Sequence, residues 1–95
     1  MTVGTMKIKL HLSTSTSLKD KRSVLQSSMS QIRNRFQVAV AEVDESELWQ
    51  IAVIGVVCVS NSNKHSSQIL NSVMKFVESL PLEIIESQQE IISGF

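Results

Sequence analysis

Residues 48–60 restrict the fold more than any other segment, because they are apolar on both sides of an extended chain. In a strand, alternate residues point to opposite sides. One side would carry Leu48, Ala52, Ile54, Val56 and Cys58, and the other Trp49, Ile51, Val53, Val57 and Val59. Such a strand lies centrally in a sheet whose two faces are both covered. One interpretation is that a partner chain covers one of these faces. The sequence leaves open which side faces the core.

The first half of the chain predicts a strand, a helix and a second strand. Residues 3–12 alternate between apolar and polar side chains, as a half-buried strand does. Residues 18–36 carry apolar side chains at helical spacing, and Ser17 is predicted to cap this helix, with Asp20 three positions later. The β-branched residues within 38–43 favour a strand that follows the helix without an intervening Gly or Pro.

The second half predicts another helix and a last strand. Asn61, Ser62 and Asn63 are alternative N-caps for the helix, and Pro81 is expected to end it. Residues 82–92 then form a more acidic strand. Its regular alternation would place Ile84 on the same side as three polar residues, Glu86, Gln88 and Glu90.

The predicted order of these elements is β-α-β-β-α-β. With right-handed crossovers around a central hairpin, this order gives an α+β, ferredoxin-like sandwich, in which two helices cover one face of a four-stranded antiparallel sheet. A chain of 95 residues is expected to form a single domain over residues 1–95. The other sheet face stays open and would expose an apolar row. This row predicts a protein partner, such as a homodimer, through the candidate interface residues Trp49, Ile51, Val53 and Val57.

The net charge of zero hides a division between the two parts of the chain. Residues 1–40 have a net charge of +6, whereas residues 41–95 have a net charge of −6. The basic part could neutralise the phosphates of RNA, so RNA or the ribosome is a predicted partner. Alternatively, the basic residues form a solvated helix face, or the two parts interleave and neutralise each other. The candidate basic surface consists of Lys7, Lys9, Lys19, Lys21, Arg22, Arg33 and Arg35.

The residues that usually carry catalysis or hold metals form no recognisable motif. Two histidines and one cysteine make no zinc pattern, and the acidic residues of segment 42–47 lack the spacing of a calcium loop. We therefore expect no catalytic residues, no metal site and no cofactor, and we predict neither DNA nor membrane binding. A single cysteine, no signal peptide and no apolar run of about 20 residues favour the cytoplasm.

A resemblance to a known family rests on four segments, which together span essentially the whole chain. They are SLKDKRSVLQ at 17–26, RNRFQVAVAEVD at 33–44, LWQIAVIGVVCVS at 48–60 and the final acidic strand. These segments resemble the YlxP-like family of small bacterial proteins, a domain of unknown function. The resemblance implies a ferredoxin-like fold and no catalytic residues. Family members are often encoded beside translation initiation and ribosome maturation factors, which implies a role linked to RNA or the ribosome.

One departure from the family pattern bears on the open face of the sheet. Ile51 and Val53 occupy positions that are often polar in relatives. This departure from the family pattern favours a covered open face in this family member.

Overall fold

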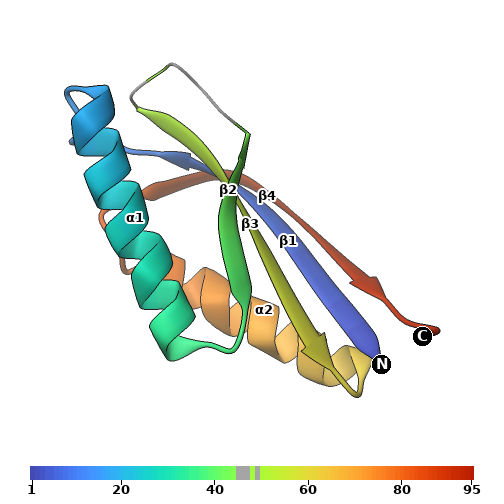
Figure 1. The fold of residues 1–95 in the computed structure, drawn as a ribbon. Helices are drawn as coiled ribbons and strands as arrows, with labels where there is room; N and C mark the ends of the chain where they lie inside the picture. The colour runs from blue at the N-terminus through green and yellow to red at the C-terminus, as the bar shows by residue number, and fades with distance from the viewer. Residues whose placement is uncertain (45–47, 49) are drawn as a thin grey trace.

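The computed structural model describes residues 1–44, 48 and 50–95, and in these residues the predicted elements follow in the predicted order (Figure 1). The sheet has the strand order β2-β3-β1-β4, and all neighbouring strands are antiparallel. This arrangement confirms the ferredoxin-like sandwich. The elements are β1 (Thr2–His11), α1 (Leu18–Arg35), β2 (Ala39–Asp44), β3 (Ile51–Ser60), α2 (Asn63–Val77) and β4 (Glu83–Ile92).

Serine side chains cap both helices. Ser17 Oγ accepts a hydrogen bond of 3.1 Å from the backbone N–H of Asp20, which confirms the predicted start of α1. The Asp20 carboxylate accepts from the hydroxyl of Thr16 at 2.6 Å and from its backbone N–H at 3.2 Å. These bonds lower the pKa of Asp20, with a smaller contribution from Lys19. Ser62 is the residue, among the three candidates, that caps α2.

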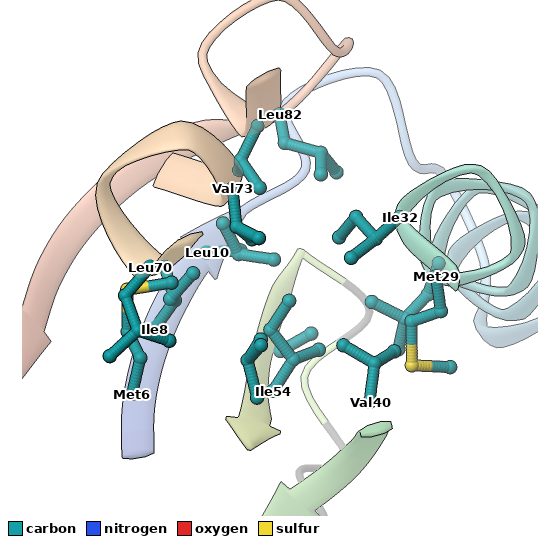
Figure 2. Close-up of a cluster of buried hydrophobic side chains, with 14 of the residues drawn as sticks. Met6, Ile8, Leu10, Met29, Ile32, Val40, Ile54, Leu70, Val73 and Leu82 are labelled. Carbon is teal, nitrogen blue, oxygen red and sulfur yellow. The ribbon is translucent and has the colours of Figure 1, made fainter. Parts of the chain in front are cut away.

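The core lies between the two helices and one face of the sheet (Figure 2). β1 contributes its even-numbered apolar side chains, and β3 contributes Ala52, Ile54, Val56 and Cys58. The helices cover them with Leu25, Met29 and Ile32 of α1 and with Leu70, Val73 and Val77 of α2. The question that the sequence left open is thereby settled: the odd-numbered side of β3, with Ile51, Val53, Val57 and Val59, lies away from the helices.

A β-bulge in β4 overturns one detail of the predicted last strand. Glu86 lies opposite Lys9, and Ile84 lies opposite the next residue of β1, Leu10, so Ile85 is the extra residue. The bulge reverses the alternation. Ile84 therefore packs against the core, and the expectation that it shares a side with Glu86 is wrong.

Candidate functional site

The face of the sheet opposite the helices, called the open face below, is organised in rows that run across the strands. At each level, one odd-numbered residue of β3 lies between a residue of β1 and, over most of its length, a residue of β2. β4 extends the rows beyond β1. From one end to the other, the rows are Val59, Val3 and Ile92; then Ala39, Val57, Thr5 and Glu90; then Ala41, Gly55, Lys7 and Gln88; then Asp44, Val53, Lys9 and Glu86.

One end of the open face is apolar and accessible. Val59, Val57 and Ile92 keep 60%, 39% and 38% of their surface exposed. Val59 and Ile92 both lie opposite Val3, and Val57 lies in the next row. We call Val3, Val57, Val59 and Ile92 the apolar end. Contiguous exposed apolar groups of this kind are typical of interaction surfaces.

The opposite half of the open face is charged. Val53 is flanked by Lys9 on β1 and by Asp44 on β2, and it keeps only 8% of its surface exposed. Lys9, Asp44, Val53 and Glu86 line a shallow hollow of about 160 Å³. Of the four candidate interface residues, Val57 is therefore accessible, Val53 is covered, and Ile51 is half-buried. Trp49 lies outside the described residues, as does most of the acidic turn.

The residue Asp44 reaches the open face because β2 also contains an irregularity. Glu42 pairs with Ile54 on the helix side, but Asp44 pairs with Val53, so the register shifts between these two residues. Val43 then leans over the glycine of β3: its Cγ1 lies 2.7 Å from where a Cβ of Gly55 would be. Regular alternation would put Asp44 on the helix side, and for this reason the sequence did not identify it as a surface residue of the open face.

The seven residues of the candidate basic surface do not form one patch. Lys7 and Lys9 lie on the open face, whereas the other five belong to α1 on the helix side. Lys21 is only 4% exposed; its Nζ donates to the carbonyl of Leu48 at 3.2 Å and lies 3.9 Å from Oε2 of Glu42. Lys21 is therefore a buried structural cation at the interface between α1, β2 and the chain that precedes β3.

The remaining basic residues of α1 are exposed, and their side chains differ in the contacts that they make. Nη2 of Arg33 donates to the carbonyl of Val40 at 2.6 Å, and the guanidinium of Arg35 lies 4.4 Å from the centre of the Phe76 ring. Lys19, Arg22 and Arg33 lie within about 60° of one another around the helix axis, by α-helical geometry. Of these three residues, Arg33 contacts β2, through the carbonyl of Val40.

The described residues offer little for catalysis or metal binding. No group of three or more His, Cys, Asp or Glu side chains within residues 1–44, 48 and 50–95 is arranged to hold a metal ion. Cys58 is buried, and its Sγ lies 3.9 Å from the carbonyl of Ser66. Across the same residues, no helix is both long and apolar enough to cross a membrane.

Comparison with known proteins places the chain in a family. Residues 3–89 match the sequence model of a family described as "Protein of unknown function (DUF503)". The chain belongs to this family. The DUF503 chain is also 34% identical to "Uncharacterized protein YlxP" of Bacillus subtilis (strain 168) over 65 residues, which cover 68% of this chain and 71% of that protein. The resemblance to YlxP-like proteins is thereby confirmed.

Solved structures support the fold of this DUF503 protein. A de novo designed protein with a ferredoxin fold superposes with a TM-score of 0.57 and 5% identity, over 97% of this chain and 84% of the design. SnoaB, a cofactor-independent oxygenase from Streptomyces nogalater, superposes with a TM-score of 0.50 and 9% identity, over 97% of this chain and 92% of that protein. At such identities the likeness concerns the fold alone.

Proposed function

We propose that this chain is a non-enzymatic, cytoplasmic binding protein and that it contacts another protein through its open face. The observation that carries the proposal is the accessible apolar end, on the side of the sheet that the helices leave uncovered. The homodimer predicted from the sequence is one form of such contact. The family match supports neither an activity nor a partner, so the proposal rests on the surface itself.

The apolar end supplies enough hydrophobic free energy to matter for binding. Fully burying a Val or Ile side chain contributes about 1.5–3 kcal/mol. The exposed fractions of Val57, Val59 and Ile92 together correspond to somewhat more than one complete side chain. Their burial would therefore contribute about 2–4 kcal/mol, a factor of roughly 30 to 800 in affinity.

The experiment compares proteins that co-purify with the tagged chain from its native cells. The variant Val59→Asp places a carboxylate at the apolar end, where the wild-type side chain is already mostly exposed, so folding is preserved. Lys64→Asp, on the exposed start of α2, is the matched control. We expect wild type and control to retain the same proteins and Val59→Asp to lose them. Equal retention by all three would show that the open face is not the contact surface.

A second candidate function is binding of structured RNA along α1, because Lys19, Arg22 and Arg33 share one flank of that helix. The gene neighbourhood of YlxP-like proteins also supports a role linked to RNA. Contacts from this flank would bind phosphates, which gives affinity without reading the base sequence. The separation of Lys7 and Lys9 from α1 makes this surface smaller than the sequence predicted.

Salt dependence tests this second function. Association with ribosomal RNA fragments is measured from low to physiological salt for wild type and for Lys19→Gln with Arg22→Gln. Loss of two phosphate contacts should reduce the slope of log affinity against log salt by about 1.5. The control carries Lys64→Gln with Lys75→Gln on α2 and should keep the wild-type slope. If the slope of the α1 variant is unchanged, α1 does not contact RNA.

A further inference from the structure

The part of one row that lies on β2, β3 and β1 is complementary in charge to its own reverse, with Glu86 of β4 outside this part. Asp44, Val53 and Lys9 lie side by side on β2, β3 and β1. Across the sheet, their side chains are therefore negative, neutral and positive in charge. Reversing this row gives positive, neutral and negative. A second copy turned over about β3 would therefore present Lys9 to Asp44 and Asp44 to Lys9.

We propose that the partner of the open face is a second copy of this chain, packed face to face about a two-fold axis that runs along β3. The inference rests on the proposed function of the open face and names its occupant and orientation. The axis lies between the two sheets, parallel to the strands (compare Figure 1 for the positions of β1, β2 and β3). In this arrangement β3 stacks on β3 of the second copy, and β1 stacks on β2 of that copy.

Two further rows fit the same axis, whereas in the row of Gly55 the side chain of Lys7 meets Ala41 and gains no charged partner. At the apolar end, Val57 and Val59 meet the same residues of the second copy, so these two exposed side chains are buried, whereas Ile92 on β4 lies beyond the overlap. In the row of Val57, Thr5 meets Ala39, and both side chains are small. The same symmetry operation thus pairs apolar with apolar, small with small, and cation with anion, as an isologous interface requires.

Two other two-fold arrangements of the open faces are less favourable in charge. An axis along β1 would place the apolar row of β3 over β4, so that Val53 meets Glu86 and Val57 meets Glu90. An axis across the strands would leave β1 over β1, and where it crosses β1 between Lys7 and Lys9 it brings these lysines against each other. Uncompensated like charges in a partly buried interface are unfavourable. Of these axes, only the one along β3 places Lys9 over Asp44 of the second copy, and Lys7 then faces the uncharged Ala41.

The twist of the sheets does not remove the charge contact. Aligned sheets cross at about 30°, which shifts residues one strand from the axis by only about 3 Å along the strand. The flexible side chain of Lys9 spans such a shift. β3 is about 30 Å long, but β2 has six residues and is only about 20 Å long, so the overlap of β3 with β3 and of β1 with β2 on either side gives roughly 350 Å² of flat area for each copy. This area is smaller than that of stable specific interfaces, so the dimer is weak and dissociates on dilution.

The test is a charge exchange followed by sedimentation velocity of the purified chain, from about 1 to 500 µM because a small interface dissociates in this range. Wild type should approach the mass of two chains at the top of the range. Lys9→Asp and Asp44→Lys should each weaken self-association at least tenfold. An equimolar mixture of the two variants should recover a two-chain species, since the carboxylate at position 9 of one chain then faces the amine at position 44 of the other. The chain carrying both substitutions should also dimerise.

Controls separate the interface from folding. Lys64→Asp and Glu78→Lys reverse charges at exposed positions on the helix side and should sediment as wild type does. Thermal unfolding identifies any variant that fails to fold. Should a charge exchange at position 9 or 44 unfold the chain, Val59→Asp replaces it, because the exposed Val59 tolerates substitution and lies on the same axis.

Two outcomes overturn the inference at different levels. A wild-type mass of one chain at every concentration shows that the open face does not bind a second copy; the co-purification experiment on Val59→Asp still decides whether it binds another protein. A wild-type dimer that shows no recovery in the mixture of Lys9→Asp and Asp44→Lys refutes the axis along β3. Recovery in the mixture, with loss in each variant alone, supports both the occupant and its orientation.

Discussion

Replacing Gly4 with alanine measures how tightly α2 packs against the sheet. Gly4 lies in β1, where its missing side chain lets Cys58 of β3 and two residues of α2 approach the backbone. A Cβ at this position would lie 2.8 Å from Sγ of Cys58, 3.1 Å from Cδ1 of Leu70 and 3.3 Å from Cβ of Ser66. Three contacts this short, from two different elements, cannot all be relieved by rotating one side chain.

The expected loss of stability follows from two opposing effects. Adding a methyl group to a packed core costs about 1–3 kcal/mol. Replacing glycine in a strand gains about 0.5–1 kcal/mol, because the unfolded chain loses freedom and the φ of Gly4 is ordinary. The net loss in the free energy of unfolding is therefore about 1–2 kcal/mol, or about 5–15 °C in Tm for a domain of this size.

A double-mutant cycle with Cys58→Ala identifies the clash as the cause. Cys58→Ala removes the sulfur that lies closest to the added Cβ, so the two substitutions together should cost less than their sum, by about 1 kcal/mol. Thermal and urea unfolding of the four proteins supply the values. Additive losses, or a Tm for Gly4→Ala equal to that of wild type, would refute the idea that close packing of α2 dictates glycine here.

Two further predictions concern charged groups of α1. Lys21→Met keeps the buried stem but removes the ammonium that donates to Leu48, and it should lower the free energy of unfolding by about 1–2 kcal/mol in urea. Lys19→Met, exposed on the same helix, should change it by less than about 0.5 kcal/mol; equal effects would contradict a structural role for Lys21. The pKa of Asp20 is below its ordinary value of 3.8, so its carboxylate stabilises the fold above that pH, and the stabilisation disappears as the pH falls through the lowered pKa. The stability difference between wild type and Asp20→Asn should therefore shrink on acidification below 3.8; a difference that is constant with pH would exclude this linkage.

The sequence predicted the fold because local patterns were unambiguous in most elements. The alternation of apolar and polar residues over 3–12 indicates a strand, and the helical spacing of apolar residues after Ser17 indicates a helix. Ser17 caps α1 as expected. β3 was different, because both of its sides are apolar and alternation alone cannot choose between them. The choice depends on α1 and α2, whose apolar side chains pack against Ile54 and its even-numbered neighbours.

The surfaces were harder to predict, because they depend on where the sheet separates the residues. Lys9 and Arg33 belong to one basic segment of sequence but lie on opposite sides of the sheet. The bulges at Val43 and Ile85 lack a Gly or Pro that would mark them, so the positions of Asp44 and Ile84 were not evident. Burial of Lys21 depends on the carbonyl of Leu48, which is distant in the sequence.

The central position of β1 in the sheet has a consequence for how the chain folds during synthesis. The first strand to be made pairs on one side with residues 51–60 and on the other with residues 83–92. Its backbone hydrogen bonds can therefore form only after at least 40 further residues have been synthesised. The sheet is complete only after β4 has emerged from the ribosome. Pairings this distant in sequence slow folding relative to helical proteins of the same length. Until they form, the apolar β3 has no permanent neighbour on its β1 side, so the nascent chain is most prone to aggregate in the interval between the synthesis of β3 and its docking on β1.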